Sequence, residues 1–262
     1  SQVTGLSGKE ILQIVEYHGG ILIPAHAFTP HKSFYGRSFE SFRQVFSEEE
    51  WDRIYGVELG LSSDTYLADF LAELEGKTFI SNSDAHSLIK IAREYNLVKM
   101  KDLSYKEFLL ALKRIEGRKV TTNYGLDPRL GKYHRSFCPE CNKNFPLKYP
   151  VLRCPQCNKE DIVTGVKDRI LKISSRDSSL SPDHRGTYIH QVPLHDIPGI
   201  GKKTYQALLN AFGTEMNVIH QTKSEDLLNV VNKKIAERII KARSGNIKIE
   251  DGGGGYYGKV MG

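Results

Sequence analysis

The chain has 262 residues, of which 39% are hydrophobic and 26% charged, and its formal net charge is +6 at neutral pH. This composition can bury a core and excludes a disordered chain. No apolar run reaches the ~18 residues of a membrane span. No basic-then-apolar signal segment opens the chain either, so we expect a cytoplasmic protein with no membrane partner.

The charge is unevenly distributed along the chain. Residues 1–125 carry 15 Lys and Arg against 17 Asp and Glu, whereas residues 126–262 carry 22 against 14. A basic half joined to a nearly neutral half indicates a module that binds a polyanion. A basic surface that is merely solvated is the alternative interpretation of the same charge.

The first 125 residues alternate short apolar runs with helical patterns. We expect helices over residues 7–20, 47–55, 63–74 and 104–115, and strands over residues 21–23, 56–60 and 78–81. This alternation predicts an α/β fold with a parallel sheet covered by helices. In such folds the chemistry lies where the carboxyl ends of the strands meet.

Polar residues follow the expected strand ends. His26 and His31 lie after the first strand, Glu58 lies in the second, and Asp84 and His86 follow the third. If the third strand continues through Asp84 and His86, its period of two points both side chains the same way. A His and an Asp at one mouth are ligands for Zn, Mn or Mg, although each residue alone reads as an ordinary loop residue.

Two strings at these strand ends resemble motifs of the PHP (polymerase and histidinol phosphatase) metallo-phosphoesterase family. They are residues 23–26 (IPAH) and residues 80–86 (ISNSDAH). The resemblance implies a distorted (β/α)7 barrel that holds two or three divalent ions, with residues 1–130 as its C-terminal portion. The family's first motif, a His-x-His, and its second motif do not occur here. We therefore expect the chain to be the C-terminal part of a longer protein, whose N-terminal part completes the same barrel.

Residues 131–175 contain two Cys-Pro-x-Cys knuckles, formed by Cys138 with Cys141 and by Cys154 with Cys157. Two such turns can hold one zinc ion in a tetrahedron of four thiolates, whereas a redox pair is the competing interpretation. Four thiolates leave no open coordination position. We therefore predict a structural zinc ribbon that has no catalytic role.

Residues 186–246 are expected to form a small all-α domain. Its segment 197–204 (IPGIGKKT) resembles a helix-hairpin-helix motif, in which Gly199 and Gly201 allow close backbone approach and Lys202 and Lys203 add positive charge. An ordinary helical turn is the alternative. Residues 230–236 resemble a degenerate second hairpin, and the Gly-rich tail, residues 247–262, is expected to be a flexible exit or a joint to further residues.

The order of barrel, four-cysteine ribbon and helix-hairpin-helix resembles the endonuclease Q family. That resemblance implies a DNA-repair endonuclease that hydrolyses a phosphodiester 5′ of deaminated bases (uracil, hypoxanthine) or abasic sites in double-stranded DNA, using metal-activated water. It assigns His26, Asp84 and His86 as metal ligands, with Asp84 also orienting the nucleophile. It places Glu58 and His31 beside them as further catalytic residues.

Two other functions remain open at this point. The same barrel could serve a PHP-type small-molecule phosphatase, although the ribbon and hairpins would then have no purpose. A fragment that lacks the first motif could also be a non-catalytic DNA-binding module. For the lesion pocket, Phe28, Phe34 and Tyr35 could stack on a base, but core packing is the favoured role for each.

Overall fold

The computed structural model describes residues 4–262. Its first paired strands are β1 (Gly56–Glu58) and β2 (Thr78–Ile80), which run parallel with Val57 opposite Phe79. A second sheet has the order β3 (Tyr95–Lys99), β4 (Lys119–Leu126) and β7 (Thr187–Gln191). In that sheet β3 and β4 are antiparallel, whereas β4 and β7 are parallel. The mixed α/β class is confirmed, and the two parallel pairs are consistent with part of a barrel.

Side chains join the two sheets where backbone pairing is absent. Asn96 of β3 accepts a hydrogen bond from the Ser81 N–H (2.8 Å) and donates one to the Ser81 carbonyl (2.9 Å). Asn123 of β4 donates to the Phe79 carbonyl (2.9 Å) and to Asn96 (2.8 Å). The two amides thus take the place of a backbone ladder between β2 and the second sheet.

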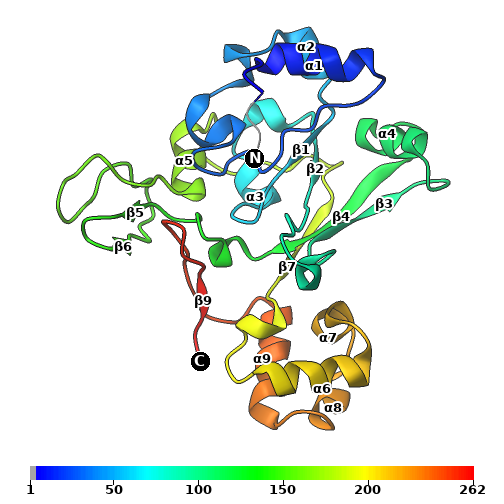
Figure 1. Cartoon of the computed structure of the whole chain (residues 1–262), viewed down its shortest axis with the longest axis vertical. Coiled ribbons are helices and arrows are strands. Elements are labelled where there is room, and N and C mark those ends of the chain that lie inside the picture. Colours follow the sequence, from blue (N-terminus) through cyan, green and yellow to red (C-terminus); the bar gives the residue numbers. More distant parts are fainter. Residues whose placement is uncertain (1–3) are drawn as a thin grey trace.

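Five helices lie around these strands (Figure 1). They are α1 (Gly8–Tyr17), α2 (Glu48–Asp52), α3 (Thr65–Ala68), α4 (Tyr105–Lys113) and α5 (Val166–Ile173). The capping box predicted at the start of α2 is present, since the side chains of Ser47 and Glu50 each bond the other's backbone N–H.

The expected elements differ from the structure in three main respects. Residues 21–23 form no strand. In the segment that follows them, only the Pro24 carbonyl and the Ala27 N–H form backbone–backbone hydrogen bonds with β1, because proline has no N–H to donate. The helix expected over residues 63–74 starts later, at the cap Asp64, and ends at Ala68, next to the buried ion pair of Asp69 with Arg185 (2.7 Å). The helix expected over residues 104–115 ends at Lys113, and Ile115 lies beyond it and is exposed.

The main core is aromatic and lies under α1 and α2. The rings of Phe42 and Trp51 stack with centroids 4.8 Å apart. Phe28 and Tyr35 are fully buried in the same cluster, and Phe34 packs against it. Core packing, the favoured role for these last three aromatic residues, is therefore confirmed.

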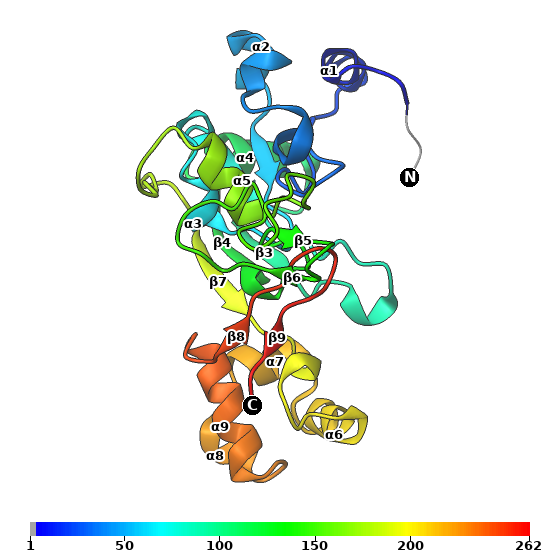
Figure 2. The same ribbon diagram turned by 90° about the vertical axis from the view of Figure 1, so that its left-hand side faces the viewer.

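The four cysteines lie beside a short antiparallel pair, β5 (Phe137–Cys138) with β6 (Lys143–Asn144). The tail forms β8 (Ile249–Glu250) and β9 (Lys259–Val260), joined by a turn that returns to this region (Figure 2). The Arg135 N–H donates to the Gly252 carbonyl (2.9 Å). A Cβ at Gly252 would lie 2.4 Å from the Gly131 carbonyl oxygen. The expectation of a flexible exit is therefore wrong: the glycines are needed because the backbones pack closely.

The last domain is helical, and its hydrophobic core continues into the rest of the protein through Leu126, Leu130 and Val260. Its helices are α6 (Lys202–Phe212), α7 (Glu215–His220), α8 (Ser224–Leu228) and α9 (Lys233–Arg243). It lies at one end of the molecule, beyond β7 (Figures 1 and 2). Over residues 4–262, no helix is both long and apolar enough to cross a membrane.

Candidate functional site

The loop after residue 23 is held by Glu58, which is almost fully buried. One carboxylate oxygen of Glu58 accepts from the His26 N–H, and the other accepts from the Gly60 N–H at 2.7 Å. Burial raises the pKa of Glu58, partly offset by these two N–H groups, and the charge of nearby Asp84 raises it further. Glu58 therefore fixes the His26 loop at the end of β1, with Asp84 within electrostatic reach.

Three of the predicted site residues have unusual backbone conformations. The φ angles are +33° at His26, +74° at His31 and +44° at Asp84. A left-handed conformation costs a non-glycine residue about 1–2 kcal/mol, and such strain clusters at functional sites. In addition, the His26 Nδ1 atom is buried and has no hydrogen-bond partner. An orphaned imidazole nitrogen fits a metal ligand.

The loop after β2 differs from the sequence-based expectation. The strand ends at Ile80, and Asp84 and His86 are exposed in a loop, so the period-two argument for these two residues was wrong. The His86 Nδ1 atom hydrogen bonds to the Asp84 carbonyl (2.7 Å), which leaves Nε2 free to bind a ligand. This loop leaves the sheet directly after Ser81, the residue that Asn96 holds.

The structure brings His26, Glu58 and Asp84 into one region but does not gather a closed set of metal ligands there. Within residues 4–262, only the four cysteines place three or more His, Cys, Asp or Glu ligand atoms within 4.8 Å of one another. The metal-ligand assignment of His26, Asp84 and His86 therefore stays a prediction.

Two further residues contribute to this end of the fold, and neither was assigned a role from the sequence. The Tyr133 ring lies edge-on to His31 with centroids 6.5 Å apart, and its backbone N–H donates to the Ser62 hydroxyl (3.3 Å). His190 of β7 hydrogen bonds through Nε2 to an Asp64 carboxylate oxygen (2.8 Å). Burial opposes the charged imidazole, but the bond to Asp64 outweighs it and raises the pKa of His190. No local sequence signal marked His190, whose partner is distant in the chain.

The four cysteine thiols form one compact cluster. Their Sγ atoms approach at 3.6 Å (Cys138 to Cys157) and 3.7 Å (Cys141 to Cys154). A tetrahedron with Zn–S bonds of about 2.3 Å has S···S edges of about 3.8 Å, which these distances match. Burial raises the pKa of Cys154, but N–H donors of Cys157 and Gln156 outweigh it and bring the pKa to about 6. The cluster therefore fits a zinc ion held by four thiolates.

The predicted hairpin leads into α6. Gly199 has a φ of +94°, which favours glycine, and Gly201 caps the helix with open space around its Cβ position. Lys202 and Lys203 are exposed at the start of the helix, where N–H groups favour an anion. From α9, Arg238 donates to the Pro198 carbonyl (2.7 Å) and supports the hairpin. The degenerate second hairpin leads into α9, which Asn232 caps.

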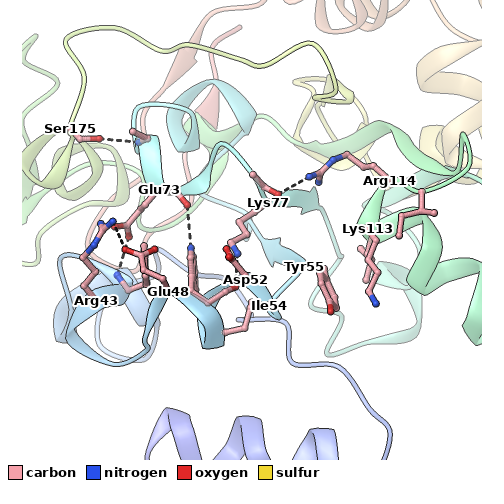
Figure 3. Close-up of a pocket in the computed structure, with 16 residues that line it drawn as sticks. Arg43, Glu48, Asp52, Ile54, Tyr55, Glu73, Lys77, Lys113, Arg114 and Ser175 are labelled. Carbon is pink, nitrogen blue, oxygen red and sulfur yellow. Dashed lines mark hydrogen bonds and ion pairs between the residues drawn. The ribbon is translucent and has the colours of Figure 1, made fainter.

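A cavity of about 720 Å³ lies at the other end of β1 and β2 (Figure 3). Tyr55 and Lys77, which precede the two strands, are among its lining residues. Burial lowers the pKa of Lys77 to about 8. None of the predicted metal ligands lines this cavity, so it is not the candidate site.

Similarities to known proteins agree with this organisation. Residues 193–243 match the family described as SAM-like helix-hairpin-helix tandem. The Bacillus subtilis (strain 168) protein YqxK is 45% identical over 97% of this chain and 64% of its own length. The Methanocaldococcus jannaschii protein MJ0043 is 36% identical over 90% of this chain and 31% of its own length. The chain thus spans less than two thirds of these two relatives.

Two solved structures resemble nearly the whole chain. The lesion-specific endonuclease PfuEndoQ from Pyrococcus furiosus is 34% identical, with a TM-score of 0.82 over 98% of this chain and 66% of that chain. Endonuclease Q in complex with a 27-mer duplex that has an abasic lesion at the active site is 33% identical. Its TM-score is 0.83 over 98% of this chain and 67% of that chain.

Proposed function

The chain belongs to the endonuclease Q family, and on this basis we propose that it serves as the cleaving and DNA-holding part of a DNA-repair endonuclease. The substrate is double-stranded DNA with an abasic site, and the reaction is hydrolysis of a phosphodiester bond. One observation carries this proposal: 98% of the chain superposes on an endonuclease Q whose active site holds an abasic duplex. We extend the proposal to duplexes with uracil or hypoxanthine, cleaved on their 5′ side, and to action in the cytoplasm.

The proposed active site lies where the His26 loop and the loop after β2 approach each other. The orphaned His26 Nδ1, the free His86 Nε2 and the exposed Asp84 carboxylate would hold two or three divalent ions (Zn, Mn or Mg). Such ions supply a hydroxide near neutral pH and stabilise the leaving oxygen. Because these residues form no closed ligand set, we propose that a further segment of the same barrel supplies the remaining ligands.

The chain's own residues then have separate tasks. Asp84 orients the attacking water. Glu58 is not a free base, because both of its oxygens accept backbone N–H groups; it positions His26. We assign to His31, which is exposed beside Tyr133, contact with the reacting phosphate. The hairpin at Gly199–Lys203 holds the DNA backbone without reading its sequence.

An incision assay with Asp84→Asn tests the proposal in the protein that contains the complete barrel. The amide keeps the shape of the carboxylate but is a poor ligand. Loss of residues that merely support metal ligands costs about 10–100-fold, so this change should cost at least about 100-fold while binding to DNA persists. The matched control is Asp102→Asn, in an exposed loop elsewhere, which should cut like wild type.

The assay uses abasic, uracil and hypoxanthine duplexes with added Mg²⁺, Mn²⁺ or Zn²⁺. If Asp84→Asn nicks the DNA at the wild-type rate, Asp84 has no role in the reaction. Hydrolysis of small phosphomonoesters without DNA incision would instead favour the phosphatase. Binding without any hydrolysis would favour a non-catalytic DNA-binding module.

A further inference from the structure

The tail turn presents two tyrosines next to the candidate site. Its ends are fastened to one short segment, since the Gly255 N–H donates to the Lys132 carbonyl and the Gly258 N–H to the Leu130 carbonyl, both at 2.9 Å. Between them, Tyr256 and Tyr257 are 66% and 50% exposed. The turn is therefore a fixed support for rings that face solvent.

Two lysines converge on one of these rings. The Nζ atoms of Lys90 and Lys132 lie 5.7 Å and 5.6 Å from the centre of the Tyr257 ring. Among residues 4–262, no carboxylate lies within 4.0 Å of either amine. Asp196, whose charge reaches Lys90, contacts His195 instead, at 3.3 Å. Neither amine forms an ion pair, so both remain available to bind an anion.

The same region exposes large apolar side chains. Leu88, Ile89 and Ile91 are 87%, 66% and 61% exposed in the loop that follows His86. Contiguous exposed apolar groups mark a surface that another molecule covers. The region also reaches the candidate site, because Lys132 lies over the Tyr133 ring (5.7 Å), which in turn contacts His31.

We propose that Lys90, Lys132, Tyr256 and Tyr257, here called the tyrosine–lysine surface, bind the damaged DNA strand beside the cleavage site. The lysines hold a phosphate and Tyr257 stacks on a base that has lost its pairing. This inference rests on the proposed function. A DNA partner fits better than a protein, because exposed rings with unpaired lysines form platforms for unpaired strands, whereas the cores of protein interfaces are depleted of lysine.

The test measures binding of wild type and variants to an abasic duplex and to the same duplex intact, by fluorescence anisotropy over a range of salt concentrations. Tyr257→Leu should weaken binding to the abasic duplex about tenfold and leave the intact duplex nearly unaffected, because only an unpaired base can stack. Tyr257→Phe keeps the ring and should bind like wild type.

Charge variants separate this surface from the hairpin. Lys90→Gln combined with Lys132→Gln should flatten the salt dependence for the abasic duplex by up to about two units. Lys202→Gln with Lys203→Gln should instead weaken both duplexes alike. The exposed Lys106→Gln on α4 is the control and should change neither.

Two failures can be told apart. The wild-type protein that contains the complete barrel is also assayed for incision. If it neither binds the abasic duplex more tightly than the intact one nor incises it, the proposed function fails and this inference with it. Wild type may instead prefer and incise the abasic duplex while Tyr257→Leu binds both duplexes like wild type, or binds both more weakly by the same factor. Either result overturns only the role of the tyrosine–lysine surface, and the surface then faces a protein.

Discussion

Replacing Asn96 by alanine tests whether two side-chain amides hold the sheets together. In Asn96→Ala, the Ser81 N–H and carbonyl lose their partners, and Asn123 keeps only its bond to Phe79. Ser81 is 4% exposed, so water cannot easily replace the lost bonds. Each buried backbone group left without a partner costs about 1–3 kcal/mol. After partial relaxation, the free energy of unfolding should therefore fall by about 2–4 kcal/mol.

Urea unfolding followed by tryptophan fluorescence measures this change. Trp51 is the single tryptophan and is buried in the main core. Its fluorescence therefore reports unfolding of the part of the chain that contains both sheets rather than of the helical domain. Asn82→Ala removes an exposed asparagine one position after Ser81 and should change stability by less than about 0.5 kcal/mol. A loss below about 1 kcal/mol in Asn96→Ala would refute the amide ladder.

Three further results are expected. Cys154→Ser should lower the zinc content from one ion per chain to none, measured by metal analysis; unchanged zinc would rule out the four-thiolate site. Replacing Lys202 and Lys203 by Glu should weaken binding to every duplex and flatten its salt dependence by about one unit per lost phosphate contact, so unchanged binding would leave the hairpin as scaffold. Because the pKa of His190 is raised, its bond to Asp64 adds stability below pH ~6.5 that is lost as pH rises through the folded-state pKa. His190→Gln should therefore lower the melting temperature more at pH 5.5 than at pH 8, and an equal loss at both would contradict this.

Local signals in the sequence were sufficient for some elements. The capping box of Ser47 with Glu50 depends on residues three apart, and the cysteine knuckles pair residues within 20 positions. The structure confirms both. They were predictable because each motif is complete within a short stretch of chain. Gly199 also lies within such a short motif, and its positive φ is a local property of the hairpin.

Non-local contacts explain what sequence reasoning missed. The expected continuation of β2 to Asp84 failed because the strand leaves the sheet after Ser81, where Asn96 of another strand holds it. The tail was misjudged because glycine indicates flexibility in isolation. At Gly252, however, the tail packs against the backbone of Gly131, which is more than a hundred residues away in sequence. Such contacts leave no periodic pattern in the sequence.

The path of the tail also constrains how the helical domain can move. The chain enters this domain after β7 and leaves it after α9, and the departing strand is fastened again at Arg135 and Leu130. Side chains add further contacts, since His220 of α7 lies edge-on to the Tyr124 ring of β4 (5.0 Å) and hydrogen bonds to Gln191 of β7 (2.8 Å). The helical domain is therefore held in place relative to the sheet. Under the proposed function, this fixed placement would set the distance along the duplex between the contacts made by the hairpins and those made by the candidate site.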